Sequence, residues 1–542
     1  MSAYPAHGRD RKAGRQGGQL GPTRRVGAVP PGLRTISSVV STPVVSIRPA
    51  RVRVGMDHSQ APVLAALADY QRRGDIPFSP PGHKQARGAD KRVVEVLGAA
   101  VFHSDIVATA GLDDRQSSRG ILEHAQKLMA DAVGAEHTFF TTGGSSLSVK
   151  SAMLSVAGPR EKLLVGRDAH KSVGAGLVLS GIRPIWVQPQ WDPDVHLAHP
   201  PAPQAYAAAF EQHPDARGAL VISPTPYGTC ADLAAITRVC HERGRPLIVD
   251  EAWGAHLPFH PDLPAWGINV GADVCVTSVH KMGSGLEQGS VLHQQGELVD
   301  PAVLKACIDL LGTTSPSVLI YAGLDGWRRQ MVQHGHELMS AALDLAHRTR
   351  AQIEDIDGLH VPGEEFTGPG RAFDHDPLQV VIDISGLGVL GYRAADWLRD
   401  CHHINVHLSD HRRIDAQLSH ADDTDTAWIL LNALRDLGTH APELRGGPTI
   451  TVPAPETMRL ELVHQPQEAF FGRTENVPVA AAPGRISAET LTPHPPGIPA
   501  VLPGERITGP VMAYLTSGMR AGMVIPDASD PELGRIRVLV ED

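Results

Sequence analysis

Between residues 60 and 345, short apolar runs alternate with longer stretches of helical periodicity. The short runs are rich in β-branched residues and have the length of strands that are buried on both faces. Because helix-length spacers separate them, they predict right-handed βαβ units and a mostly parallel sheet with helices on both faces. The predicted strands are Thr138–Thr141, Leu163–Val165, Pro184–Val187, Ala219–Ile222, Leu247–Val249 and Val274–Thr277.

After residue 345 the pattern predicts smaller units. A long helix at Leu338–Arg350 leaves the large domain, and a proline-rich passage at Pro493–Pro503 sets off the last portion of the chain. We therefore expect a large α/β domain with its N-terminal segment over residues 56–345, and one or two smaller C-terminal α/β domains over residues 346–542. Their predicted elements are strands at Leu378–Ile384, Ile404–Leu408, Thr457–Leu462 and Ile536–Val540, and helices at Gly391–Cys401, Thr426–Leu437 and Gly509–Ala521.

The first 55 residues are rich in Gly, Pro, Ser and Arg and have no apolar periodicity, which predicts a disordered basic tail. An alternative is that translation starts at Met56, because Met56–Pro62 leads directly into the amphipathic run Val63–Tyr70. A secretory signal is disfavoured, since the segment lacks a continuous apolar stretch.

Composition narrows the class of protein. The chain of 542 residues has 42% hydrophobic and 20% charged residues, which is typical of a soluble enzyme. The net charge of −10 for the whole chain hides a more acidic body after the basic tail. An acidic body suits a cationic ligand and argues against nucleic-acid binding. No apolar run approaches the roughly 18 to 20 residues of a membrane span. The 5 cysteines show no C-x-x-C pattern, which favours reduced thiols in a cytoplasm over disulfides or a zinc site, so no metal is expected.

The strand Val274–Thr277 runs into a polar turn that contains Lys281. A lysine at that position can be desolvated, which lowers the pKa of its amine and makes the neutral form available for imine formation. Ser278 and His280 in the same turn could bind a phosphate. Alternatively, Lys281 is a surface residue at the rim of the sheet.

Asp250 stands at the carboxyl end of the strand Leu247–Val249. Ligands of open α/β sheets bind at that edge, and a carboxylate there can pair with a pyridinium nitrogen. The alternative is an N-cap aspartate for the next helix.

Two further turns follow predicted strands in the same order along the chain. The turn Gly143–Ser148 precedes a helical run, so its backbone amides and hydroxyls form a natural phosphate site. The turn Arg167–Ser172 contains His170, whose ring could lie flat on a planar cofactor. Each turn alone is a weak signal, since Gly-Ser turns and polar loop histidines are common.

Together these stretches resemble the fold-type I group of pyridoxal-phosphate (PLP) enzymes, specifically the bacterial ornithine/lysine/arginine decarboxylase family. The resemblance covers about residues 60–540. Its motifs here are Pro80–Lys84, Gly111–Asp114, Gly143–Ser148, Ala169–Ser172, Ser223–Gly228, Asp250–Trp253, Ser278–Lys281, Thr314–Ser317, Pro495–Pro499 and Pro503–Glu505.

The resemblance implies a role for each matching residue. Lys281 corresponds to the Schiff-base lysine, Asp250 to the partner of the pyridine nitrogen, and His170 to the residue stacked on the ring; these and His280 form the expected catalytic set. The other expected cofactor contacts are Gly144, Ser145, Ser146, Ala252 and Ser278, with Thr314 and Ser315 reaching the cofactor of a neighbouring subunit. The resemblance also implies a homodimer or higher homo-oligomer with active sites at the subunit interface. The Thr-Gly-Gly-Ser-Ser phosphate turn departs from the common family pattern, which puts its individual ligands in doubt by one position, and His494 replaces an aromatic residue before Pro-Pro-Gly.

The family implies decarboxylation of a basic amino acid to carbon dioxide and a polyamine precursor. The distal cation of such a substrate needs an acidic partner, for which Asp113, Asp114 and Glu505 are candidates by motif position. Asp113 and Asp114 are equally explained as helix caps. The sequence does not separate arginine, lysine and ornithine, and a PLP-dependent aminotransferase or lyase on the same fold, or a non-catalytic binding homologue, are the alternatives.

Overall fold

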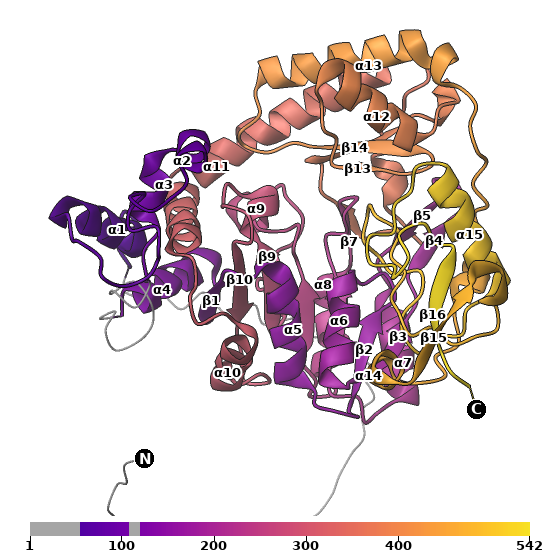
Figure 1. Cartoon of the computed structure of the whole chain (residues 1–542), viewed down its shortest axis with the longest axis horizontal. Helices are drawn as coiled ribbons and strands as arrows, with labels where there is room; N and C mark the ends of the chain where they lie inside the picture. The colour runs from indigo at the N-terminus through magenta and orange to yellow at the C-terminus, as the bar shows by residue number, and fades with distance from the viewer. Residues whose placement is uncertain (1–54, 108–119, 542) are drawn as a thin grey trace, which may run out of the picture. The chain divides into compact units, whose positions relative to one another are not determined.

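A seven-stranded sheet organises the large domain of the computed structural model, which describes residues 55–107 and 120–541. The strand order is β1-β10-β9-β8-β6-β2-β3. Figure 1 shows β1, β10 and β9 towards one side of this sheet and β2 and β3 towards the other. Neighbouring strands from β9 to β3 are parallel, and β10 is antiparallel to both β1 and β9. The strands are β1 (His137–Thr141), β2 (Lys162–Gly166), β3 (Arg183–Val187), β6 (Ala219–Ile222), β8 (Leu247–Asp250), β9 (Val274–Ser278) and β10 (Ser290–Gln294). The predicted α/β class is confirmed, and so are all the strands predicted for this domain; β10 was not predicted.

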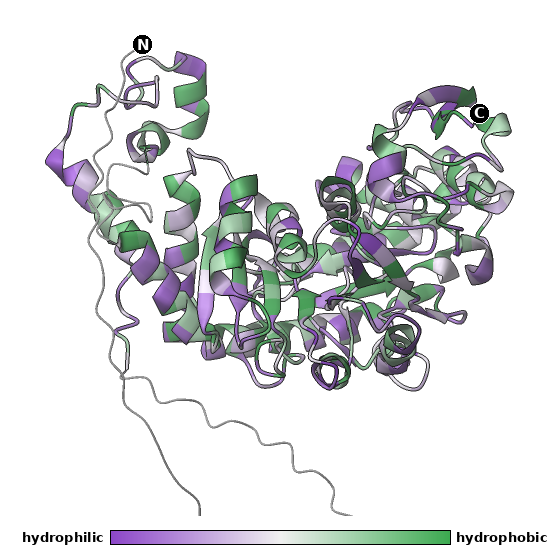
Figure 2. Ribbon diagram, turned by 90° about the horizontal axis from the view of Figure 1, so that it is seen from below, coloured by the Kyte–Doolittle hydropathy of each residue, from purple (hydrophilic) through white to green (hydrophobic). Residues whose placement is uncertain are grey.

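Two hydrophobic clusters lie on the two faces of this sheet, because successive residues of a strand point to opposite sides. In β2, Leu163 and Val165 belong to the cluster formed with α5, α6 and α10, whereas Leu164 belongs to the cluster formed with α4, α7 and α8. Figure 2 shows the mainly hydrophobic strands between the helices. The helices are α4 (Ile121–Val133), α5 (Gly144–Val156), α6 (Lys171–Ser180), α7 (Pro203–Gln212), α8 (Leu233–His241) and α10 (Pro301–Leu311).

The long helix α11 (Val318–Glu354) leads from the seven-stranded sheet to a small antiparallel sheet of order β12-β14-β13. Residues 52–542 form one compact unit, in which this small sheet and the helices beside it are called the small domain below. Helix α12 (Gly391–His402) packs on β13 and β14, and α13 (Thr424–Leu444) packs against α12 and α11. Both helices were predicted. The strands are β12 (Gln379–Asp383), β13 (Leu408–Ser409) and β14 (Arg413–Gln417). Of the predicted strand Ile404–Leu408, only Leu408 has strand geometry; the residues before it form a connection to the neighbouring helix.

The C-terminal portion has its own core around β15 (Thr474–Pro478), β16 (Arg535–Leu539) and α15 (Gly509–Arg520). The predicted helix and final strand are confirmed. The predicted strand Thr457–Leu462 is wrong: Pro455–Met458 is a 3-10 helix, since Pro455 fixes a helical φ and cannot donate to a ladder, and only Leu462 forms an isolated bridge.

No helix among the residues described is long and apolar enough to cross a membrane. The remaining elements of the fold are shorter or peripheral. They are α1 (Pro62–Arg73), α2 (Lys91–Leu97), α3 (Ala99–Ser104), α9 (Val279–Met282), α14 (Pro466–Phe471), β4 (Gln190–Asp192), β5 (Leu197–His199), β7 (Thr229–Cys230), β11 (Asp374–His375) and the 3-10 helices η3 (Leu257–Phe259), η4 (Glu364–Phe366), η5 (Ser385–Leu387), η6 (Pro455–Met458) and η7 (Val479–Ala481).

Candidate active site

The predicted site residues follow the carboxyl ends of parallel strands. The turn after β2 carries His170, β8 ends at Asp250, and β9 leads into α9 with Lys281. Parallel strands bring these ends to one edge of the sheet, where α/β proteins bind their ligands. The edge therefore gathers residues that are far apart in the sequence.

Lys281 lies in the four-residue helix α9, and its Nζ is 4.0 Å from the centroid of the Trp253 ring. Desolvation by burial lowers the pKa of the amine to about 8, although the charges of Asp250 and Glu287 act in the opposite direction. A substantial fraction of the amine is therefore neutral near physiological pH, which is the form that attacks a carbonyl.

Asp250 is buried at the end of β8 and is only 3% exposed. Its Oδ1 accepts a hydrogen bond of 3.2 Å from the backbone N–H of Ala252, whose own carbonyl accepts one from Ser278. Burial raises the pKa of the carboxyl and the positive charge of Lys281 lowers it. A buried carboxylate in this setting is suited to hold a proton on a basic ring nitrogen.

The His170 side chain caps the N-terminus of α6. Its Nδ1 lies 3.2 Å from the backbone N–H of Ser172, which donates to it, and burial together with the charge of Lys281 lowers the pKa of the imidazole to about 3. The ring is therefore neutral, with Nδ1 as an acceptor and the proton on Nε2. Gly497 lies against it: a Cβ at that glycine would be 3.1 Å from Cδ2 of His170.

The residues predicted to bind the phosphate lie at the start of α5 and at the end of β9. Gly144 has a φ of +69°, and the first turn of α5 presents Ser145 and Ser146, of which Ser146 is exposed. The Ser278 hydroxyl is fully buried and has no hydrogen-bond partner in residues 55–107 and 120–541. Ser278 is the N-cap residue of α9, and a phosphate oxygen is a suitable hydrogen-bond partner for its buried, unpaired hydroxyl.

His280 precedes Lys281 in α9, and its ring contacts residues that lead into β10. Its Nδ1 lies 3.1 Å from the carbonyl of Gly289 and donates to it, and its Nε2 lies 3.7 Å from the exposed Glu287.

The outer predicted residues have varied positions. Thr314 and Ser315 are exposed between α10 and α11, whereas Asp113 and Asp114 lie outside the residues that the structure describes. Glu505 is fully buried; its Oε2 forms an ion pair of 3.1 Å with Arg167 and accepts a bond from the N–H of Leu502.

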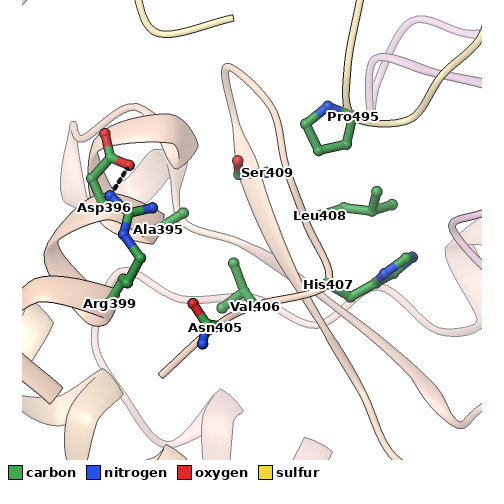
Figure 3. Close-up of a pocket in the computed structure, with 9 residues that line it drawn as sticks. All are labelled: Ala395, Asp396, Arg399, Asn405, Val406, His407, Leu408, Ser409 and Pro495. Carbon is green, nitrogen blue, oxygen red and sulfur yellow. Dashed lines mark hydrogen bonds and ion pairs between the residues drawn. The ribbon is translucent and has the colours of Figure 1, made fainter. Parts of the chain in front are cut away.

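Two side chains of the site were not assigned a role from the sequence. Trp253 was recognised only as part of a motif, yet its ring lies beneath Lys281 Nζ and 4.5 Å from the ring of His407, centroid to centroid. His407 precedes β13 in the small domain, and burial, with Lys281 nearby, lowers its pKa to about 4. It lines a pocket of about 140 Å³ in which Figure 3 shows it on the same side as Pro495. His407 is far from Trp253 in the sequence, and only the fold brings the two rings together. No local sequence motif therefore identifies His407 as part of the site.

A larger cavity of about 570 Å³ lies beside the His170 turn. Its wall includes Asp168 and Tyr227 from the large domain and Asp410 from the small domain. This volume falls in the range of small-molecule sites. No cluster of potential metal ligands occurs in the part of the chain that is described.

Fold and site together define a fold-type I PLP enzyme, because the buried lysine, the buried aspartate and the orphaned Ser278 hydroxyl match the three chemical parts of that cofactor. The family model for the Orn/Lys/Arg decarboxylase major domain matches residues 61–367, and that for the C-terminal domain of the same family matches residues 455–527. The chain belongs to the Orn/Lys/Arg decarboxylase family. The predicted enzyme class and cofactor are thereby confirmed.

Similar proteins cover most of the chain. The arginine decarboxylase of Bacillus anthracis is 37% identical over 483 residues, which are 89% of this chain and 98% of that protein. The arginine decarboxylase of Bacillus subtilis is 35% identical over 90% of this chain and 99% of its own length. Among solved structures, lysine decarboxylase A of Pseudomonas aeruginosa superposes with a TM-score of 0.73 at 21% identity over 88% of this chain and 80% of that one. The latter similarity concerns the fold.

Proposed function

We propose that this PLP-dependent decarboxylase acts on arginine. The observation that carries the reaction class is the juxtaposition of Lys281, Asp250 and His170 at one sheet edge, where the charge of Lys281 shifts the pKa of both other groups. Arginine is favoured because relatives named arginine decarboxylase are 37% identical over 98% of their length, whereas a lysine decarboxylase of Pseudomonas aeruginosa is 25% identical over 74% of its length.

The residues of the site divide the chemistry. When bound, PLP supplies the electron sink for the electron pair that remains after the bond between Cα and the carboxylate breaks. Asp250 would hold a proton on the ring nitrogen, and the neutral His170 ring would cover one face of the cofactor. The Ser278 hydroxyl and the first turn of α5 would hold the phosphate.

Protonation of the substrate Cα requires a donor close to the cofactor. Lys281 and His280 are the candidates, and the structure favours Lys281, because a buried amine with a pKa of about 8 can both hold and release a proton near neutral pH. The Nδ1–H of His280 already donates to the Gly289 carbonyl.

Arg167 bears on the rival reaction, transamination. A free arginine that clamps the α-carboxylate would favour it, since decarboxylation needs that group to lose its charge in a less polar setting. Arg167 follows β2 close to His170, but its guanidinium donates to the carbonyl of Pro499 and pairs with Glu505. This engagement supports decarboxylation, and it also suggests that Glu505 serves Arg167 rather than the substrate.

We further propose a homodimer or higher homo-oligomer in a reducing cytoplasm, forming a polyamine precursor. Large apolar side chains are exposed near the N-terminal segment and on α10: Phe78 is 97% exposed, Val96 82% and Leu310 75%. A second copy of the chain is a fitting cover for them. All the cysteines are free, which suits a reducing compartment.

A substrate panel tests this proposal. Arginine, lysine and ornithine are offered separately to the PLP-loaded protein, and amine product, carbon dioxide and keto acid are measured for each. Amine and carbon dioxide in equal amounts, with kcat/KM highest for arginine, are expected. Keto acid without carbon dioxide would establish transamination, and a preference for lysine would refute the substrate assignment. Light scattering on a sizing column checks the oligomer, and a monomer would contradict it.

A further inference from the structure

The backbone around Lys281 has little support of its own. Helix α9 has only four residues, Val279–Met282, and its N-cap Ser278 makes no side-chain cap hydrogen bond. Carbonyls in the last turn of a helix lack intrahelical partners, so the Lys281 carbonyl needs a donor from elsewhere. The direction of the lysine side chain depends on how that turn is held.

Gln417, the last residue of β14 in the small domain, supplies this donor. Its Nε2 donates to the carbonyl oxygen of Lys281. Directly opposite Gln417 in the antiparallel pair lies Gln379 of β12, whose Nε2 is 3.2 Å from Sδ of Met282. Two adjacent side chains of the small sheet therefore contact two consecutive residues of the lysine turn.

These contacts link the active-site lysine to a domain other than the one that carries it. The amide of Gln417 is uncharged, so it acts on Lys281 through the position of the backbone rather than through charge. The thioether contact of Gln379 is a weak hydrogen bond, which leaves Gln417 as the stronger of the two. If the Gln417 bond is lost, the turn is free to tilt and the buried Nζ gains water.

We propose that Gln417 is a positioning residue that keeps the Lys281 amine buried against Trp253 and aligned with the cofactor. The inference rests on the proposed function and adds to it a role for the small domain in setting the state of the lysine. A shift of the small sheet would be transmitted to Lys281 through this bond.

Three variants test the inference. Gln417→Ala removes the donor, and Gln417→Met keeps a similar size and no charge while offering no donor. The matched control is Gln295→Ala, because Gln295 also donates from Nε2 to backbone carbonyls, those of Ile268 and Ala272, away from the lysine turn.

The first measurement needs no cofactor. The rate at which an amine reagent labels Lys281 in the apoprotein is followed against pH, with the labelled peptide identified by mass. The native midpoint is expected near 8. In both Gln417 variants it should rise by about half a unit or more, because renewed hydration favours the charged amine.

The second set of measurements uses the loaded enzyme. The PLP dissociation constant should rise about fivefold in the Gln417 variants, the effect expected from one ordinary hydrogen bond. The value of kcat should fall about tenfold or more from misalignment, while KM changes little. Gln295→Ala should lower thermal stability and leave the labelling midpoint unchanged.

The outcomes separate the two proposals. If the native protein neither binds PLP nor releases carbon dioxide, the proposed function fails, whatever the variants do. If the native protein is active but both Gln417 variants keep its labelling midpoint and PLP affinity, or Gln295→Ala reproduces their shift, the positioning role is refuted. Should Gln417→Ala not fold, the similarly sized and uncharged Gln417→Met decides alone.

Discussion

Replacing Gly497 by alanine tests whether the C-terminal portion of the chain supports the ring of His170. Gly497 has a φ of +88°, and its carbonyl accepts a 3.0 Å hydrogen bond from the N–H of Lys171. An alanine Cβ would lie 3.1 Å from Cδ2 and 3.2 Å from Nε2 of His170. Ordinary contacts between such atoms are about 3.5–4.0 Å, so the ring must move by several tenths of an ångström.

Two costs follow. The positive φ costs an alanine about 1–2 kcal/mol. In the proposed role of His170, the displaced ring would lose part of its stacking on the cofactor. Since an aromatic pair contributes about 0.5–1.5 kcal/mol, the PLP dissociation constant should rise about two- to tenfold. The first cost lowers the stability of the fold, whereas the second appears only in cofactor binding.

Gly484→Ala is the matched control, because Gly484 has a φ of +91° and a Cβ at that position would have no heavy atom within 4 Å. Both variants are assayed for melting temperature without cofactor and for PLP affinity by absorbance titration. Similar falls in melting temperature are expected, with weaker PLP binding in Gly497→Ala alone. Equal PLP affinities in the two variants would refute the contact between Gly497 and a cofactor-stacking His170.

Two further predictions follow from buried charges. Labelling of the Lys281 amine in the native apoprotein should rise with pH around 8 rather than around the ordinary 10.5, because the neutral form grows as pH exceeds the lowered pKa; a midpoint above 10 would contradict burial of the amine. Arg328→Ala should lower the free energy of unfolding by about 3–5 kcal/mol, because it leaves the fully buried Asp325 without its ion-pair partner. Arg399→Ala, which breaks an exposed pair with Asp396, should lower it by about 1 kcal/mol or less. Similar losses for the two variants in denaturant titrations would contradict this prediction.

The parallel core of the fold was predictable, because its strands are buried on both faces and form continuous apolar runs such as Ala219–Ile222. The antiparallel strand β10 was missed, since Ser290–Gln294 mixes apolar with polar residues and no helix-length spacer separates it from the lysine turn. The strand predicted at Thr457–Leu462 failed because alternation alone does not show whether a pairing partner exists.

The sequence predicted candidate site residues where they stand at or just after the end of a strand, as Asp250 and Lys281 do. His407 and Gln417 were not predicted, because both come from the small domain. Only tertiary folding brings His407 to Trp253 and Gln417 to the lysine turn. The expectation that Glu505 meets the substrate depended on motif position, which carries no information about its ion pair with Arg167.

The central claim is that Lys281 binds PLP covalently. The loaded protein is reduced with borohydride, digested, and analysed by peptide mass spectrometry, with decarboxylation of arginine measured before and after reduction. One pyridoxyl-phosphate label per chain on Lys281, with loss of activity in proportion to labelling, is the predicted result. A label on another lysine, or full activity after complete labelling of Lys281, would contradict the account.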